Sequence, residues 1–498
     1  MISSKSYKKE SSRKKQDMQD GSSSSDGIWI SFADNAKRFL QKTQEHVLQG
    51  INPGGIYQAI WCRDAAYILK DWFLSGNIHG TMQQIYQIWS HQIEPNREKL
   101  VYGRGSPEMK FLSEVAREDK QKEYEGALPT TIYQAGFSEV YGQNPDIDST
   151  ALMISTSSWI LSKCLKNRQS LFETLSTSDD TTTIASEHSS GYISVLLSKL
   201  GLTDPLKVVE FVLPRMLHAV EYLSNRDIDN DGLLEQNHNE DWMDTAIRAG
   251  KIVYSQACWI LALSNLGSLL SQLGRDDESD KLTILADKAL KAVDGNLWSE
   301  EDGCYLDIQE THHIGGPYRT LTQDISLFLV AITENTMSDS FNVTRKHNRK
   351  QEAEAKILDD NLHSRANRTL DAIRTRAWKD KWPLVNEVEL KATGPWILKP
   401  YQYHNHTFWP WSTGIEMLAR SRFDRVEECD ILFSKLASEG HPHIHAFYEW
   451  VNPITDRPDG SFPFRTGISA IRTAIANILE KIKRSSSSPS MLQPKEEQ

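Results

Sequence analysis

Apolar residues recur at helical spacing through most of this 498-residue chain, and no other feature limits the possible folds as much. Val253, Ala257, Ile260 and Leu261, for example, fall on one face of a helix. Alternating apolar and polar residues, which are typical of strands, are almost absent, and no fixed repeat indicates a solenoid. The predicted helices are 28–49, 62–76, 80–95, 148–165, 204–225, 251–273, 276–293, 320–335, 352–377, 408–421, 423–438 and 466–484. The sequence therefore predicts an all-α protein, and a toroid of paired helices can hold this many helices in one domain.

Composition excludes several classes of protein. The chain has 56 Lys and Arg against 67 Asp and Glu, a net charge of −11, which argues against nucleic-acid binding. Uninterrupted apolar runs stay well short of 18 residues, so no membrane-spanning helix is predicted. The first residues, 1–26, lack the apolar core of a secretion signal. The five cysteines are dispersed without a Cys-x-x-Cys pair, which favours reduced thiols and a cytoplasmic location.

Four segments are too polar or too low in complexity to contribute to a core. Residues 1–26 and 485–498 are rich in Ser, Lys and Glu, and we expect disordered tails there. Polar insertions are expected near 176–190 and 336–365, the second of which could form an exposed helix. The predicted catalytic domain therefore spans residues 27–484.

The loops between the helices are long and rich in Trp, Asp, Gly, Pro and His, and functional residues concentrate in such loops. One loop contains Tyr57, Trp61, Arg63 and Asp64 within eight residues. As a surface ion pair, Arg63 and Asp64 would merely favour the helix N-terminus. The same group can also bind a sugar, with the rings against its apolar face and the charged groups on its hydroxyls. Asp148 starts the helix 148–165 and can cap it or face a pocket.

A second acidic loop surrounds Trp242 with Glu240, Asp241 and Asp244. A carboxylate against an indole ring in a partly apolar pocket has a raised pKa, so it can hold a proton near neutral pH. This is the property that a general acid needs. The alternative is a solvated acidic loop, which is the usual setting for a short run of charge.

Two later loops combine rings with polar groups. One contains Tyr403, His404, Asn405 and Trp409, and the other places Glu449 between aromatic residues ahead of a Pro/Asp/Gly-rich stretch. An isolated glutamate is usually a surface residue. Here its setting is again that of a carboxylate beside rings, in a loop preceding a helix.

Metal sites are not predicted. Residues 227–238 resemble the start of an EF-hand loop, but His238 stands at position twelve, where calcium requires a bidentate Glu. His404 and His406 are two residues apart, without a clear third ligand. We therefore expect neither a metal nor an organic cofactor.

Taken in order, these segments resemble the glucoamylase and glycogen-debranching glucosidase group of six-hairpin enzymes, similar to glycoside hydrolase family 15. The motifs are Y-x-x-x-W-x-R-D at 57–64, D-G-L-L…W-M-D at 231–244, Y-H-N-x-x-x-W-P at 403–410 and a late Glu loop at 449–460. The resemblance covers most of the chain, from about Tyr57 to Leu479. It implies an (α/α)6 toroid that acts on oligosaccharides or small glucosides.

The resemblance also implies roles for individual residues. Asp244 would be the general acid and Glu449 the general base of an inverting, exo-acting enzyme that releases glucose from α-glucosides. Glucoamylases have a Glu directly after the Trp, where Met243 stands here, so Glu240 or Asp241 could replace Asp244. The implied substrate-binding residues are Tyr57, Trp61, Arg63, Asp64, Asp148, Trp242, His404, Asn405 and Trp409.

Three other functions remain open at this stage. A trehalase, or a hydrolase of another small α-glucoside, would share both the toroid and the two carboxylates. A phosphorolytic relative would use phosphate in place of water. A non-catalytic sugar-binding protein would keep the aromatic and charged residues that bind the sugar, but it would not need two opposed carboxylates.

Overall fold

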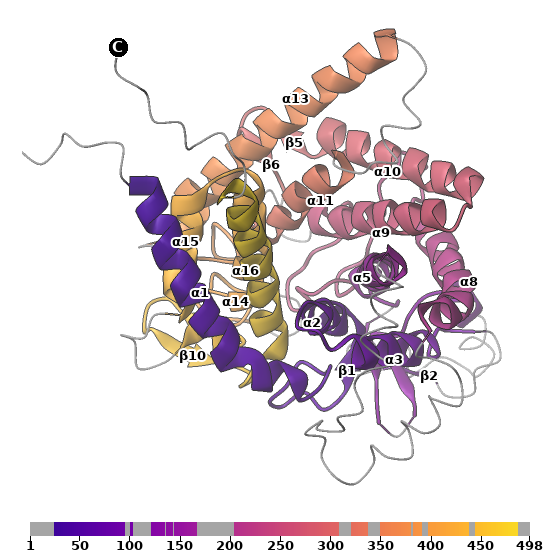
Figure 1. The fold of residues 1–498 in the computed structure, drawn as a ribbon, viewed down its shortest axis with the longest axis horizontal. Helices are drawn as coiled ribbons and strands as arrows, with labels where there is room; N and C mark the ends of the chain where they lie inside the picture. Colours follow the sequence, from indigo (N-terminus) through magenta and orange to yellow (C-terminus); the bar gives the residue numbers. More distant parts are fainter. Residues whose placement is uncertain are drawn as a thin grey trace, which may run out of the picture.

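The structure is a computed structural model, which describes residues 24–94, 100–102, 121–134, 136–142, 144–166, 204–307, 320–336, 349–379, 382–390, 397–437 and 444–486. Its long helices alternate along the chain between an outer and an inner ring (Figure 1). The inner helices are α2 (Cys62–Leu74), α5 (Ile147–Lys166), α9 (Val253–Gln272), α11 (Ser326–Thr336), α14 (Pro410–Arg422) and α16 (Arg465–Ser486). The outer helices are α1 (Ser24–Leu48), α3 (Ile78–Trp89), α8 (Pro205–Ser224), α10 (Asp276–Asn296), α13 (Arg349–Ala372) and α15 (Val426–Ala437).

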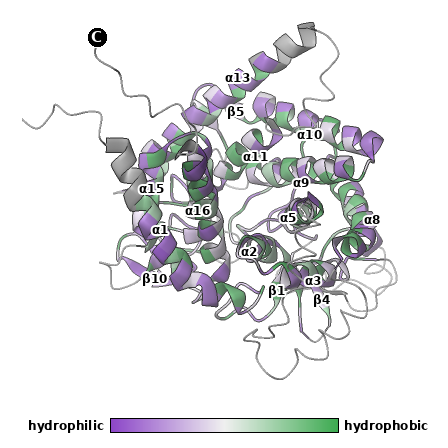
Figure 2. Cartoon of the chain, in the orientation of Figure 1, coloured by the Kyte–Doolittle hydropathy of each residue, from purple (hydrophilic) through white to green (hydrophobic). Residues whose placement is uncertain are grey.

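Each inner helix packs against the next, and α16 packs against α2, so the inner ring is closed. The inner helices are apolar because neighbours cover them on several sides: α11 is mainly hydrophobic, whereas the outer helix α13 is mainly hydrophilic (Figure 2). Among the described helices, only α9 has the length and composition of a membrane span. Its burial within the ring accounts for that composition.

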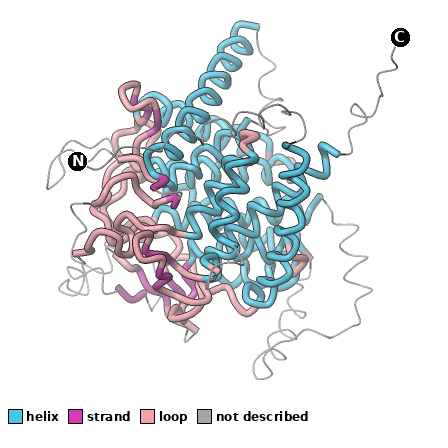
Figure 3. Tube along the Cα trace, turned by 90° about the vertical axis from the view of Figure 1, so that its left-hand side faces the viewer, coloured by secondary structure: helices cyan, strands magenta, loops and turns pink. Residues whose placement is uncertain are grey.

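Loops and short strands gather at one end of the helical body (Figure 3). Each inner helix follows an outer helix that runs the opposite way, so the inner helices share a direction and their N-termini meet at that end. A four-stranded sheet in the order β1-β3-β4-β2 and three two-stranded hairpins stiffen these loops. The strands are β1 (Ile60–Trp61), β2 (Leu100–Tyr102), β3 (Thr131–Ile132), β4 (Ser138–Val140), β5 (Trp298–Ser299), β6 (Cys304–Tyr305), β7 (Trp378–Lys379), β8 (Trp382–Pro383), β9 (Trp450–Asn452) and β10 (Arg457–Asp459).

The prediction of an all-α toroid is confirmed, and each predicted helix window overlaps one helix of the rings. Three shorter turns lie between them: the 3₁₀ turns η2 (Gln323–Ile325) and η5 (His445–Phe447), and the π-helical turn η3 (Ile373–Ala377). The strands are only two or three residues long, too short to give an alternating pattern in the sequence.

The polar segments differ in part from expectation. Residues 24–26 and 485–486 are helical, and the rest of both predicted tails lies outside the described residues. The predicted insertion near 176–190 also lies outside them. In the segment 336–365, residue 336 ends α11, 337–348 lie outside the described residues, and 349–365 form more than half of α13, in line with the expected helix. Leu362 of α13 is buried against the ring. The high charge of α13 reflects its outer, solvent-facing side.

Candidate active site

A cavity of about 350 Å³ opens at the loop end of the ring, a volume at the small end of the range for small-molecule sites. Nine residues predicted from the sequence line it: Tyr57, Trp61, Arg63, Asp64, Trp242, Asp244, His404, Trp409 and Glu449. They come from the loops that precede α2, α9, α14 and α16 and from the first turn of α2. Helix N-termini carry partial positive charge, which favours a site rich in carboxylates.

Glu449 lies buried on one side of the cavity, immediately before β9. Its Oε1 accepts hydrogen bonds from Tyr57 Oη (2.6 Å) and Tyr403 Oη (3.3 Å), and its Oε2 accepts one from Ser461 N (2.8 Å). Burial raises the pKa of Glu449, while these three donors lower it. The carboxylate is therefore partly desolvated yet stabilised in its ionised form.

Asp244 has a different environment. Its side chain is 22% exposed, and its Oδ1 accepts no hydrogen bond from any described residue. Burial raises its pKa to about 7; the guanidinium of Arg63 opposes this, and the charges of Asp241 and Glu449 reinforce it. Asp244 can therefore hold a proton near neutral pH, which is the property that the sequence predicts for a general acid.

Arg63 forms the centre of a charged group at the start of α2. Its Nη1 lies 3.5 Å from Oδ2 of both Asp146 and Asp148, and its Nε lies 3.8 Å from Asp64 Oδ2. Asp64 Oδ1 accepts a hydrogen bond from Thr466 Oγ1 (2.6 Å). Arg63 and Asp64 reach the cavity and can bind sugar hydroxyls, whereas Asp148 does not line it.

Stacked rings form the wall beneath Asp244. Trp242 packs against Trp411 (4.4 Å between ring centroids) and His404 (5.0 Å), and His404 stacks on Trp409 (4.8 Å). Burial, together with the nearby Arg63, lowers the pKa of His404 well below its usual value, so its ring is neutral. Its Nδ1 lies 2.7 Å from Thr245 Oγ1. Each of these rings lines the cavity, and an exposed ring face is an apolar surface of the kind that packs against a sugar.

Two predicted binding residues lie behind the cavity. Asp148 accepts a hydrogen bond from Trp242 N (3.0 Å), and burial raises its pKa to about 6. Asn405 holds the loop before α14, accepting from Leu390 N (2.7 Å) and donating to Leu390 O (3.2 Å). Their side chains position the loops that carry the lining residues.

The alternative acids also lie away from the cavity. Glu240 is fully buried and pairs with Arg226 (2.6 Å), and Asp241 pairs with Arg248 (3.2 Å). Neither residue lines the cavity, so Asp244 is the member of this acidic loop that faces it.

The other lining residues were not predicted: Pro53, Tyr141, Thr245, Leu398, Tyr403, Trp411, Phe464 and Thr466. Tyr403 could have been found, because it begins the Tyr-His-Asn motif that was recognised. Tyr141 and Phe464 carry no signal in the sequence, since a single aromatic residue is more often part of a core.

One acidic cluster has the geometry of a cation site, but it does not line the cavity. Among the described residues, Asp227, Asp229 and Glu235 are close enough together to share an ion. Lys251 Nζ already lies 2.6 Å from Asp229 Oδ2 and 3.3 Å from Glu235 Oε1. This lysine occupies part of the space that an ion would take and offsets part of the charge of the loop that resembles an EF-hand.

No family model matches the sequence, and no curated protein matches it. Solved structures do match. One is a family 63 mannosylglycerate hydrolase from Thermus thermophilus in complex with glucose: 13% identity, TM-score 0.53, covering 89% of this chain and 99% of that chain. Another is a glucoamylase from Saccharomycopsis fibuligera: 12% identity, TM-score 0.53, covering 91% and 96%. At these identities the likeness concerns the fold, and the chain has the (α/α)6 toroid fold of the six-hairpin glycosidases.

Proposed function

We propose that this protein is an inverting glycoside hydrolase that releases glucose from the non-reducing end of small α-glucosides. The observation that carries the proposal is the pair of carboxyl groups in one cavity: burial raises the pKa of Asp244 to about 7, whereas at Glu449 three hydrogen-bond donors oppose the rise in pKa that burial causes. A glycosidase needs this difference between its acid and its base.

In the proposed reaction the terminal sugar lies between these two groups. Asp244 protonates the oxygen of the leaving group as the glycosidic bond breaks. Glu449 removes a proton from a water molecule, which attacks the anomeric carbon from the opposite face. Arg63 and Asp64 hold the outer hydroxyls, and the ring of Trp409 packs against the sugar. Chemistry of this type uses no metal or organic cofactor.

A substrate panel tests the proposal. We expect glucose release from at least one of maltose, isomaltose, trehalose, panose and glycogen; mannosylglycerate should be included because the structural neighbour is named for it. Proton NMR in the first minutes should show the β-anomer released from an α-glucoside, since inversion needs a water molecule between carboxyl groups about 6.5–9.5 Å apart. The α-anomer as first product would exclude Glu449 as a water-activating base, and phosphate-dependent release of a sugar phosphate would identify a phosphorolytic enzyme.

Two variants separate the roles of the carboxyl groups. Glu449→Gln should lower kcat by about 10²–10⁴, the usual loss for one acid–base group. Asp244→Asn should reduce turnover of maltose strongly and that of 4-nitrophenyl α-glucoside weakly, because nitrophenolate leaves without a proton. Equal losses on the two substrates would argue against Asp244 as the acid. A sugar-binding protein without catalysis would bind the panel but release nothing.

We also propose a cytoplasmic location. The five cysteines are all buried and unpaired, which supports folding in a reducing compartment. Cell fractionation tests this, and recovery of the native protein from a secreted fraction would contradict it.

A further inference from the structure

A buried arginine joins three aspartates behind the wall of the cavity. Arg248 is about 1% exposed, and it contacts carboxylates from three separate segments. Its Nη1 lies 3.2 Å from Asp241 Oδ2, and its Nη2 lies 2.5 Å from Asp307 Oδ1 and 2.9 Å from Asp324 Oδ2. None of these four residues lines the cavity.

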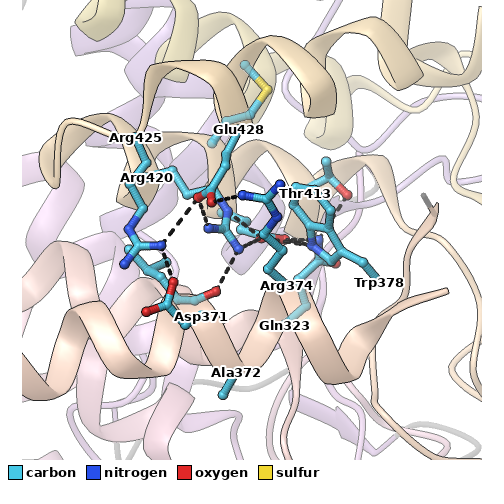
Figure 4. Close-up of polar contacts among 12 residues, drawn as sticks. Gln323, Asp371, Ala372, Arg374, Trp378, Thr413, Arg420, Arg425 and Glu428 are labelled. Carbon is cyan, nitrogen blue, oxygen red and sulfur yellow. Dashed lines mark hydrogen bonds and ion pairs between the residues drawn. The ribbon is translucent and has the colours of Figure 1, made fainter. Parts of the chain in front are cut away.

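Asp324 links this cluster to the cavity wall. The same Oδ2 that accepts from Arg248 also accepts a hydrogen bond from Trp242 Nε1 at 2.7 Å. Asp324 lies on η2, and the neighbouring Gln323 is fixed there by hydrogen bonds to Glu416 (2.7 Å) and Thr413 (3.2 Å) on α14, in the network that Figure 4 shows. The position of Asp324 is therefore fixed by Arg248 at its carboxylate and by the contacts of Gln323 with α14 at its backbone.

The hydrogen bond between Asp324 and Trp242 bears on Asp244, because the carboxyl group of Asp244 has few contacts of its own. Its Oδ1 accepts no hydrogen bond from any described residue, and the ring of His404, whose Nδ1 lies 3.8 Å away, is neutral. Trp242, two residues earlier, is instead fixed at its backbone N by Asp148 and at its indole by Asp324. The position of Asp244 thus follows from the position of Trp242.

We propose that Asp324, held by Arg248, is a positioning residue for the general acid: it fixes the indole of Trp242 and thereby places Asp244 against the leaving-group oxygen. The inference rests on the proposed hydrolase function. A displacement of about 1 Å at such a group can cost on the order of 10²-fold in rate.

The test compares two substrates on four proteins. Asp324→Ala should lower kcat/KM for maltose by about 10²-fold, and for 4-nitrophenyl α-glucoside much less, because a misplaced acid matters only where the leaving group needs a proton. Asp324→Asn should recover most of the maltose activity, since its amide oxygen can still accept from the indole. Asp71→Ala is the matched control: Asp71 is also buried and paired with a buried arginine, Arg472 (2.8 Å), but it lies away from the cavity. It should lower stability and leave the ratio of the two activities unchanged.

Three outcomes would contradict the inference. Equal losses on both substrates in Asp324→Ala would indicate a purely structural role, and no loss would remove Asp324 from the mechanism. A maltose defect as large in Asp324→Asn as in Asp324→Ala would mean that the hydrogen bond is not what matters. If Asp324→Ala does not fold, Trp242→Phe removes the same hydrogen bond from the donor side and should give the same selective loss. An inactive wild-type protein would instead refute the proposed function.

Discussion

At the scale of single residues, the position of Glu449 depends on a glycine. Gly460 has φ +76°, in the left-handed region, and its Cα faces the carboxylate. A Cβ at this position would overlap Glu449 Oε2 and lie 2.8 Å from Glu449 Cβ and 2.9 Å from Trp450 Cδ1. The β9–β10 hairpin can therefore place the carboxylate under Tyr57 and Tyr403 only if residue 460 has no side chain.

Gly460→Ala should accordingly lower kcat by about 10²-fold, because the added methyl group displaces the carboxylate of Glu449 by about 1 Å. Gly274→Ala is the matched control: its φ of +72° gives similar backbone strain, but no atom lies within 4 Å of the added methyl group. Both variants should lose stability from the backbone strain, and Gly460→Ala should lose more because of the overlap, but only Gly460→Ala should lose kcat in the folded protein. A wild-type kcat for Gly460→Ala would show that the contact is easily relieved.

The two carboxyl groups also predict the pH dependence of activity. Glu449 must be ionised, so kcat/KM should fall as pH drops through its pKa, which burial raises above the usual value. Asp244 must be protonated, so kcat/KM should fall as pH rises through about 7. The profile should be bell-shaped, with its optimum below pH 7. In Asp244→Asn the alkaline limb should disappear for 4-nitrophenyl α-glucoside, and its persistence would assign that limb to another group.

Residue motifs revealed much of this site, but not the direction of every side chain. Asp148 and Asn405 stand in the recognised segments, yet their carboxylate and amide turn toward loop backbone instead of the cavity. Asp307 and Asp324 carry no local signal, because their partner Arg248 is distant in sequence. Contacts of this kind depend on the ring being closed, so sequence spacing does not predict them.

At the scale of elements, a buried ion network joins three helices on the α14 side of the ring (Figure 4). Arg420 on α14 has no exposed surface and donates to Glu416 Oε1 (2.7 Å), to Glu428 on α15 and to Leu370 O on α13 (3.0 Å). Glu416 in turn accepts from Gln323 Nε2, beside Asp324. The network therefore links the packing of the outer helices to the segment behind the cavity.

Arg420→Met should destabilise the protein by about 3–5 kcal/mol, because it leaves Glu416 and Glu428 as buried charges without this partner. Arg484→Met is the matched control, since Arg484 pairs with Glu480 on the exposed surface of α16 and should contribute less than about 1 kcal/mol. Urea unfolding followed by circular dichroism measures both. A loss of less than about 1 kcal/mol for Arg420→Met would show that water or Arg374 compensates for the missing guanidinium.

The helices themselves could be predicted closely, because apolar spacing is a local property. Most window ends lie within about three residues of the observed helix, as for 205–224 against the predicted 204–225. The largest departures are five or six residues, at the end of α3, the start of α11 and the end of α13. The predicted helix 352–377 and the predicted polar segment 336–365 overlap, and α13 accounts for both: its Leu362 and Ala366 are buried against the ring. The arrangement of the helices in two rings was implied by the resemblance. The apolar periodicity does not predict it, because periodicity does not indicate which helices are neighbours.

At the scale of the whole molecule, the two ends of the described chain close the ring and complete the site together. Tyr57, from the loop before α2, donates to Glu449, from the loop before α16. Farther along the same helices, Arg472 on α16 contacts Asp71 on α2 (2.8 Å) and donates to Thr43 Oγ1 (2.8 Å) and Gln44 Oε1 (2.7 Å) on α1. One guanidinium thus joins the first two helices to the last.

Arg472→Met should therefore weaken ring closure, and the loss should depend on pH. Burial raises the pKa of Asp71 to about 6 even with Arg472 beside it, and removal of that positive charge should raise it further. The folded state then binds a proton that the unfolded chain, with an aspartate pKa of about 3.9, releases, so stability falls as pH rises from about 4 through the folded pKa. We expect a loss of about 3–5 kcal/mol at pH 7.5, where the folded state must either keep Asp71 charged and unpaired or bind a proton that the unfolded chain releases. The loss should be smaller at pH 5.

The double variant Asp71→Asn/Arg472→Met provides the control, because it removes both charges at once. It should be more stable than Arg472→Met at pH 7.5 and should lose most of the extra pH dependence, since removing both partners of a buried pair costs less than removing one. Urea unfolding at the two pH values measures all three proteins. If Arg472→Met loses the same stability at pH 5 and pH 7.5, Asp71 is not the group left unpaired. The hydrogen bonds from Arg472 to α1 would then account for its contribution to ring closure.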